Sequence, residues 1–412
     1  MAGTTQALML SLPPTRFRHC HFHFPSSTSF YGGRRCSLFS PIRIRASERP
    51  HHVDGNGNES AGEAVTKWLA CAKPLLNFAA NNFLPLALIA GVSLGLANPN
   101  LGCLAHRYHL SKFSTFAIFV ISGLTLKNGD IGAAVKAWPV GVSGLLSILF
   151  FTPYFSRIIL QIQLQPQQFV TGLALFCCMP TTLSSGVALT QLAGGNSALA
   201  LAMTVISNLI GILIVPFSIS KFVAAGVGVS VPTKQLVRNL VLTLLIPLIL
   251  GKVFRESFKG LADLVDQNRK LLSRISAICL SLVPWIQVSR SRSLLLMVEP
   301  AVFLTAIGLG ALMHILLLVF NVVVVQVLSA FSGGGKSVFA KKENATAFVL
   351  VASQKTLPVL VAVVEQLGGA FGESGMLVLP CVAAHLNQII IDSFLINFWL
   401  RKDHTSKTAK VA

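Results

Sequence analysis

The chain has 412 residues, of which 53% are hydrophobic and 11% are charged, with a formal net charge of +19 and a mean hydropathy of +0.69. Because a soluble domain carries about a quarter charged residues, this composition excludes a soluble protein and indicates an integral membrane protein. At about 20 residues for each spanning helix, the apolar region from residue 75 to residue 400 accommodates about ten helices and no separate soluble domain.

The N-terminal segment, residues 1–47, contains six arginines, many serines and no acidic residue. It lacks the compact apolar stretch of a secretory signal. Its composition favours a chloroplast transit peptide that ends near Ala46–Ser47 over a mitochondrial presequence or an unprocessed basic tail. Residues 48–73 are predicted to form a polar linker. The positive charge therefore reflects targeting and membrane topology, and no nucleic-acid partner is predicted.

Residues 74–402 are predicted to form one α-helical transporter domain in membrane lipid, followed by a polar tail at 403–412. Basic residues such as Lys336 and Lys341 are more frequent on the side of both termini, which places both termini inside. In a chloroplast envelope this side is the stroma. The ten predicted spans lie at about 75–97, 110–127, 134–156, 169–193, 196–225, 236–252, 273–289, 299–331, 344–366 and 374–400.

Several motif classes are excluded. The eight cysteines contain no CxxC pair, so neither a metal centre nor a redox couple is predicted. The stretch "SGGGKS" (Ser332–Ser337) lacks the first glycine of a phosphate-binding loop and follows no predicted strand. The chain has no nucleophile–base pattern, so we expect neither an enzyme nor a bound cofactor.

The fourth predicted span is interrupted by the sequence "CCMPTTLSSG" (Cys177–Gly186). Proline, glycine and hydroxyl side chains at membrane depth are tolerated where the freed backbone groups are buried in protein or line a wet cavity. A simple proline kink at Pro180 is the alternative interpretation.

The ninth predicted span carries a second interruption, "ASQKTLPV" (Ala352–Val359), in which Pro358 removes a backbone donor. Interruptions in the fourth and ninth of ten spans occupy corresponding places in two five-span halves. Since five is odd, the two halves must be inverted repeats. Paired broken segments of this kind indicate the midplane site of a transporter.

These stretches, together with "GGNSALALAMTVISNLIGILIVP" (Gly194–Pro216), resemble the bile acid:sodium symporter family. The resemblance covers most of residues 75–400 and implies ten spans with broken, crossing fourth and ninth helices. With the transit peptide, the chain is similar to the plastid members. "VPWIQVSRSRS" (Val283–Ser293) and the lysine motif resemble the divergent branch related to the seventh member of solute carrier family 10.

The resemblance implies sodium as coupling ion, but only part of the family's sodium ligand set is present. Aligned on Pro180, Ser185 matches a sodium-contacting serine, and Thr204 matches a threonine of the fifth span. Four family positions differ: Gly186 replaces an asparagine, Ala200 a serine, Leu350 the sodium-binding glutamate and Lys355 an asparagine. These departures argue against sodium coupling.

Lys355 is open to three interpretations. Its ammonium occupies the position where sodium would bind, or it binds an anionic solute directly, or it forms a structural ion pair with Asp392. A charge near the bilayer centre costs about 2.5–3.5 kcal/mol on insertion scales, so each interpretation requires a cavity or a partner.

A polar face of the last predicted span supplies candidate partners. His385, Gln388 and Asp392 recur at helical spacing and share one side of the helix. His314 and Asn321 repeat a seven-residue spacing in the eighth span, and we interpret them as a polar seam that holds helices together.

The sequence therefore predicts a secondary carrier that moves a small organic anion across the chloroplast envelope by rocking one helix bundle against another. The alternative is a membrane regulator with the carrier fold that acts through protein partners. The candidate substrate and ion-binding residues are Thr181, Thr182, Ser184, Ser185, Thr204, Gln354, Lys355 and Thr356.

Overall fold

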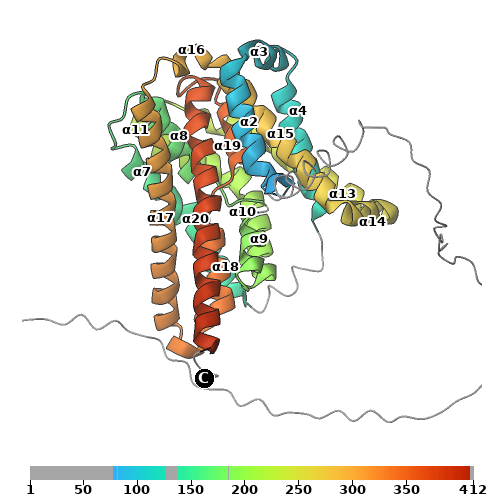
Figure 1. Ribbon diagram of the computed structural model, residues 1–412, viewed down its shortest axis with the longest axis vertical. Coiled ribbons are helices and arrows are strands. Elements are labelled where there is room, and N and C mark those ends of the chain that lie inside the picture. The colour runs from blue at the N-terminus through green and yellow to red at the C-terminus, as the bar shows by residue number, and fades with distance from the viewer. Residues whose placement is uncertain (1–77, 81, 127–136, 184, 409–412) are drawn as a thin grey trace, which may run out of the picture. The chain divides into compact units, whose positions relative to one another are not determined.

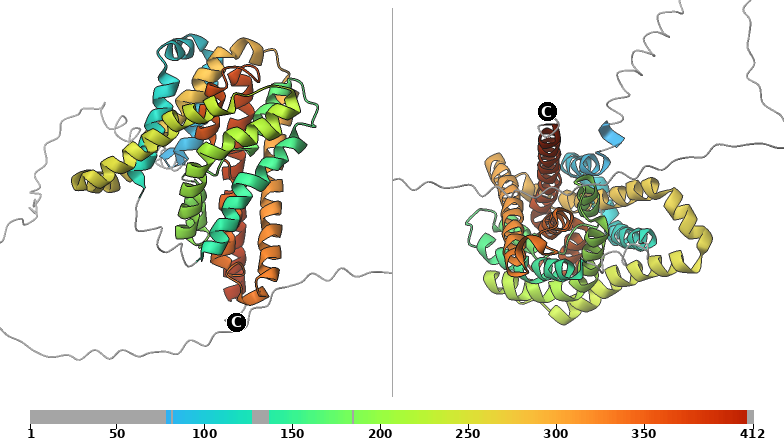
Figure 2. Two further views of the ribbon diagram at one scale, coloured as in Figure 1. Left: turned by 180° about the vertical axis from the view of Figure 1, so that it is seen from behind. Right: turned by 90° about the horizontal axis from the view of Figure 1, so that it is seen from below.

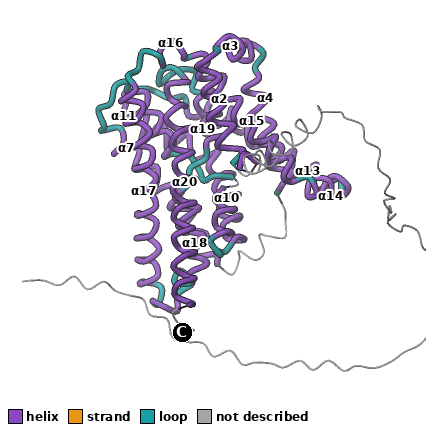
Figure 3. Tube along the Cα trace, viewed as in Figure 1, coloured by secondary structure: helices purple, strands orange, loops and turns teal. Residues whose placement is uncertain are grey.

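The structure is a computed structural model that describes residues 78–408 except residue 81, residues 127–136 and residue 184. Within these ranges the regular elements are helices and none is a strand, as Figure 3 shows. The predicted all-α membrane protein is confirmed. The predicted transit peptide and linker lie outside the described residues.

A first group of helices packs around α15 (Arg269–Arg290). The other members are α2 (Phe83–Ala97), α3 (Pro99–Arg107), α4 (Leu110–Thr125) and α13 (Ile246–Ser257), with the short α14 (Lys259–Gln267) and α16 (Arg292–Leu295) beside them. Helix α15 contacts α2, α3 and α4, and α13 lies against α4. Gly123 and Gly251 face each other where α4 and α13 cross, and a Cβ on either would overlap the other backbone. Small residues allow this close approach.

A second group is built on α17 (Pro300–Phe331) and α20 (Ser374–Thr408), which run side by side in Figure 1. Helix α20 continues beyond the boundary predicted at residue 402, and it also contacts α8. The other members are α8 (Gln167–Cys177), α9 (Ser185–Leu192), α10 (Ser197–Ser218), α18 (Lys342–Ser353) and α19 (Leu357–Gln366), with the turn η6 (Gly334–Lys336) before α18.

In the part of the chain that the structure describes, three long apolar helices contain a π-helical turn. In the left view of Figure 2, which shows the molecule from behind, one of them, α12 (Thr233–Leu240) running on into α13, crosses in front of the second group toward α14. A π-helical turn changes the hydrogen-bond register locally and is often found at functional sites. The three helices comprise α6 (Trp138–Leu146), η2 (Ser147–Phe151), η3 (Thr152–Tyr154) and α7 (Phe155–Ile159); α10, η4 (Ile219–Ala224) and α11 (Ala225–Val227); and α12 (Thr233–Leu240), η5 (Val241–Leu245) and α13.

Helices occupy each of the ten predicted ranges, but their lengths differ. Among the described residues, seven helices are long and apolar enough to cross a membrane. Helices α2 and α3, which meet at 102°, make an eighth if they count as one span. Helices α4 and α8 are apolar but shorter. The count of ten spans and the inverted repeat therefore stay predictions.

The ninth predicted span, α18 with α19, lies inside the protein. All of its apolar 18-residue window is buried (100%), whereas 33% of the corresponding window in α17 is buried. A break in lipid would leave backbone groups without hydrogen-bond partners. Burial within protein therefore permits the interruption between Ser353 and Leu357.

Candidate functional site

The two interrupted spans meet at their breaks. Helix α8 ends at Cys177 and α9 begins at Ser185, while α18 ends at Ser353 and α19 begins at Leu357. The amide of Thr356 donates to the carbonyl of Pro180 over 2.9 Å. The hydroxyl of Thr181 donates to the carbonyl of Val351 over 2.5 Å. The backbone groups freed by each break are thus partly satisfied by the other.

Gln354 lies at the centre of a buried polar network. The hydroxyls of Thr182 and Ser185 donate to its Oε1 over 2.7 and 3.0 Å. Its Nε2 donates to Oδ2 of Asp392 over 2.6 Å. The other carboxylate oxygen, Oδ1, is 2.8 Å from Nε2 of His314. One amide therefore connects α9, the break after α18 and the carboxylate on α20.

The ammonium of Lys355 is enclosed by oxygen atoms. Its side chain is fully buried (0% exposed), and Nζ donates to the hydroxyl of Thr152 over 2.6 Å and to the carbonyls of Met179 and Ile148 over 3.0 and 3.3 Å. The Met179 carbonyl is available because α8 has already ended, and Ile148 lies in the π-helical turn η2. The two irregular segments thus supply the acceptors that a buried cation requires.

The polar face of α20 supports the same break. Gln388 donates to the Lys355 carbonyl over 2.8 Å and accepts from the Lys355 amide over 3.0 Å. Its Nε2 also lies 2.8 Å from Nδ1 of His385. Gln354 and Thr356 have extended backbones, so the Lys355 backbone between them has no helical hydrogen-bond partners. The Gln388 side-chain amide takes the place of these partners.

Asp392 does not pair with Lys355, so that interpretation of the lysine is wrong. The carboxylate contacts His314 and Gln354, and the ammonium contacts only neutral oxygens in the described residues. The predicted polar seam is confirmed for both of its members. His314 joins α17 to α20, and Asn321 donates to the hydroxyl of Ser353 over 3.0 Å.

Two predicted site residues carry free hydroxyl groups. In the described part of the chain, Oγ1 of Thr204 and Oγ1 of Thr356 are buried without a hydrogen-bond partner, as is Oδ1 of Asn208. The Asn208 amide donates to the carbonyls of Thr181 and Thr204 over 2.9 and 2.8 Å, which brings α10 against the first break. Buried polar atoms are normally paired, so these oxygens are candidate contacts for a solute or for water.

The predicted site residues are therefore brought together, apart from Ser184, which lies outside the described residues. Sequence reasoning missed Ile148, Thr152, Met179 and Asn208. A usable signal existed for one of them, because Thr152 precedes a proline inside the third predicted span.

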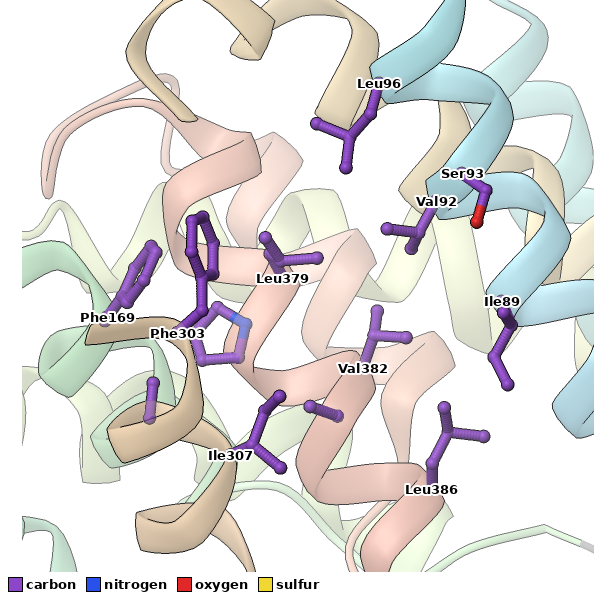
Figure 4. Close-up of a pocket in the computed structure, with 13 residues that line it drawn as sticks. Ile89, Val92, Ser93, Leu96, Phe169, Phe303, Ile307, Leu379, Val382 and Leu386 are labelled. Carbon is purple, nitrogen blue, oxygen red and sulfur yellow. The ribbon is translucent and has the colours of Figure 1, made fainter. Parts of the chain in front are cut away.

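An apolar cavity of about 300 Å³ lies between the two helix groups. Figure 4 shows Ile89, Val92 and Leu96 of α2 opposite Leu379, Val382 and Leu386 of α20. Phe169 and Phe303 lie beside each other at one end, with ring centroids 5.2 Å apart. Among the described residues that line the cavity, Ser93 alone has a polar side chain, so the cavity suits a hydrocarbon group.

Residues 81–401, most of the chain, match the profile of the SBF-like CPA transporter family. The chain belongs to this family. Membership makes the protein a transporter rather than an enzyme. The resemblance to the bile acid:sodium symporters is confirmed by the relatives that follow.

The SBF-like chain is 66% identical over 357 residues to an Arabidopsis thaliana protein named "Probable sodium/metabolite cotransporter BASS4, chloroplastic", covering 87% of this chain and 80% of that protein. A rice protein (Oryza sativa subsp. indica) of the same name is 63% identical over 336 residues, covering 82% and 79%. "Sodium/bile acid cotransporter 7-B" of Xenopus laevis is 25% identical over 290 residues, covering 70% and 81%. The last relative agrees with the predicted branch.

In this SBF-like transporter, Gly186 stands where the resemblance, aligned on Pro180, predicts an asparagine. A Cβ there would lie 3.2 Å from Oγ1 of Thr182 and 3.3 Å from Oε1 of Gln354. The Gln354 amide fills the space that a larger side chain would need. Leu350, where the resemblance predicts a glutamate, is a fully buried apolar residue (0% exposed).

Proposed function

We propose that this transporter carries a small organic anion across the chloroplast envelope and that its site works without bound sodium. The observation that carries the proposal is the position of the Lys355 ammonium, within 3.3 Å of three oxygens that come from two irregular segments. Carbonyl and hydroxyl oxygens are the ligands that hard cations such as sodium prefer. Here the Lys355 ammonium, a cation that is part of the chain, lies among such oxygens.

The contacts of Lys355 favour a fixed internal cation over a direct grip on the solute. An ammonium has three donors, and three protein oxygens accept from Nζ. No donor is left over for a bound anion. The anion would instead be attracted by the positive charge and would contact free groups such as the hydroxyls of Thr204 and Thr356.

The chloroplast envelope is proposed on two grounds. Residues 1–47 have the composition of a transit peptide. The two plant relatives at 63–66% identity are named as chloroplastic. Their names also contain sodium, and our proposal differs from that part of the name because Leu350 and Lys355 replace a carboxylate and an amide of the family's ligand set.

Flux measurements test the proposal. The purified protein would first be screened for thermal stabilisation by a panel of mono- and dicarboxylates, with and without sodium. The best ligand would then be followed as isotope uptake into proteoliposomes. We expect saturable uptake that does not change when sodium replaces potassium. Strong sodium dependence of the unmodified protein, or binding partners without flux, would contradict the proposal.

A double substitution makes the sodium test sharper. Leu350→Glu with Lys355→Asn restores a carboxylate and an amide at the two altered positions. We expect uptake or ligand stabilisation by this variant to rise with sodium concentration. If Lys355 binds the solute directly, the same variant should lose solute recognition at every sodium concentration. The single variant Leu350→Glu serves as the control. It keeps the Lys355 ammonium, so its uptake should not rise with sodium concentration.

A further inference from the structure

A half-buried carboxylate, Glu365, links the two helix groups at a distance from the broken-helix site. Glu365 lies in the last turn of α19. Its Oε1 accepts a hydrogen bond from the hydroxyl of Ser111 on α4 and a second, over 3.2 Å, from Nε2 of Gln287 on α15. Helix α19 belongs to the second group, whereas α4 and α15 belong to the first. The carboxylate therefore joins the elements that a rocking motion must separate.

The charges around Glu365 come from the first group. Lys112 of α4 and Arg290 of α15 act electrostatically on the carboxylate. Other helices that pack against α19 also carry ionisable groups. Among the described residues, the following form no ion pair with Glu365: Lys234 and Arg238 of α12, Cys177 of α8, and Cys381, His385 and Asp392 of α20. When Glu365 is ionised, two donors and two cations of the first group thus attract the end of α19.

Gln287 offers a partner to the protonated form as well. Its side chain is buried (1% exposed), and its Oε1 has no hydrogen-bond partner among the described residues. A protonated carboxyl has one O–H donor, which can donate to an amide oxygen. Rotation of the Gln287 amide would bring that oxygen toward Glu365. Both protonation states can therefore be satisfied, but only the ionised state attracts Lys112 and Arg290.

We propose that Glu365 is a proton-binding site that controls how firmly the two helix groups hold together. The ionised carboxylate holds α19 against α4 and α15. A proton taken from the water near the end of α19 neutralises the carboxylate. Its attraction to α4 and α15 is then weaker, and the two helix groups can separate. The proton returns to the same water when the groups close again, and no electrons move. The inference rests on the proposed function only for its consequence, which is pH control of transport.

Infrared difference spectroscopy tests proton binding directly. The full-length protein in lipid would be taken from about pH 8 to about pH 5, a range above the usual titration of exposed carboxyls. We expect a protonated-carboxyl band that shifts on ¹³C-glutamate labelling of the unmodified protein and disappears in Glu365→Gln. The matched control is Glu373→Gln, which removes an exposed carboxylate near the same loop and should leave the band in place.

Cysteine labelling tests the mechanical part of the inference. Ser114 is buried one turn from Ser111 on α4, so Ser114→Cys reports on opening of this contact. Its labelling rate would be divided by that of the exposed Cys103 in the same protein, which corrects for the general fall in thiol reactivity at low pH, and the remaining effect of thiol ionisation is removed by comparison with Glu365→Gln at each pH. We expect the ratio to rise several-fold on acidification, and to be high and independent of pH when Glu365→Gln is added.

Two results would overturn the inference: a spectrum without a Glu365-dependent band, or a labelling ratio that responds to pH equally with and without Glu365→Gln. If Glu365→Gln does not fold, Ser111→Ala keeps the carboxyl and should shift the frequency of the same band; an unshifted band would also count against the assignment. Neither measurement needs a solute. Failure of the flux experiment would therefore leave this test unaffected, and failure here would leave the carrier proposal intact.

Discussion

Lys355 shows how a membrane protein can hold a cation without a carboxylate. Three neutral oxygens, from Ile148, Thr152 and Met179, accept from its ammonium. A neutral amine has only two N–H groups, so three acceptors at these distances fit the charged form. The arrangement meets the requirement that a buried charge be paired or fully hydrogen-bonded, here by dipoles alone.

Removing this ammonium should be costly. Lys355→Met removes a donor from three buried oxygens, of which the Ile148 carbonyl keeps the Thr152 hydroxyl as a donor. A buried acceptor that is left without a donor costs about 1–3 kcal/mol. We expect a marked fall in thermal stability of the detergent-solubilised protein, measured by intrinsic fluorescence. Adding Asp392→Asn should not restore stability, because Asp392 contacts His314 and Gln354 instead. Restoration would show that the lysine and the aspartate do interact.

The control for that measurement is Lys336→Met, since Lys336 is an exposed lysine in the turn η6. A surface substitution of this kind normally changes stability by less than about 0.5 kcal/mol. A fall as large as that of Lys355→Met would mean that the loss of any lysine, and not the loss of the buried contacts, causes the effect.

The candidate site could be predicted in part from individual residues. Polar residues beside Pro180 and Pro358 stand out in apolar surroundings, and the structure brings them together. The acceptors of Lys355 could not be predicted in the same way, because two of them are main-chain carbonyls that every residue type possesses. The pairing of Asp392 with His314 likewise depends on how α17 and α20 are aligned, which helical spacing alone does not determine.

At the scale of elements, the breaks were predictable and the lengths were not. Proline and clustered hydroxyls mark the end of a helix locally, and both predicted interruptions occur in the structure. Hydropathy does not distinguish an α-helical from a π-helical turn, so the π-helical turns η2, η4 and η5 could not be predicted from the sequence. The bend between α2 and α3 was also missed, although Asn98 and Pro99 stand where α3 begins.

Close packing of α8 on α20 gives a test at this scale. A Cβ at Gly172 of α8 would overlap the carbonyl oxygen of Leu377 on α20. Gly172→Ala must therefore push the two helices apart, and overpacking of this kind typically costs about 1–3 kcal/mol. We expect a lower thermal midpoint and weaker ligand stabilisation, because α8 ends at the break that carries Met179 and Pro180.

Gly308→Ala is the matched control, since Gly308 is an exposed glycine of α17 and, apart from its own helix backbone and chain neighbours, no described atom lies within 4 Å of where its Cβ would be. Alanine favours a helix over glycine by about 1 kcal/mol, so this variant should be neutral or slightly more stable. Equal losses in both variants would contradict the packing explanation.

For the molecule as a whole, we expect the first 47 residues to direct the chain to the chloroplast envelope. A fluorescent protein fused after Ser60 should give a rim of fluorescence around chloroplasts in leaf cells. The same fusion without residues 2–47 is the control and should lose that pattern. Fluorescence in the endoplasmic reticulum or plasma membrane would refute the predicted location.

Both ends of the mature chain are expected on the stromal side, because an even number of spans and the distribution of Lys and Arg in the loops agree on this. Protease treatment of intact inner-envelope vesicles, with one epitope tag near each end, measures this. The two tags should be equally protected or equally accessible. Unequal cleavage would mean an odd number of spans. The described residues contain seven or eight long apolar helices, so both an odd and an even count are open to this measurement.

The buried lysine also has an electrical consequence. A sodium ion that travels with an anion is left behind on the far side, so it adds one positive charge to what each cycle delivers. The Lys355 ammonium is part of the chain and returns with the empty site, so the charge moved in a cycle is that of the solute alone. A potential of about 100 mV acts on each such charge with about 2.3 kcal/mol. A chain with this tethered cation would therefore drive a monoanion toward the positive side of the membrane, whereas carriage with one sodium ion would be indifferent to the potential.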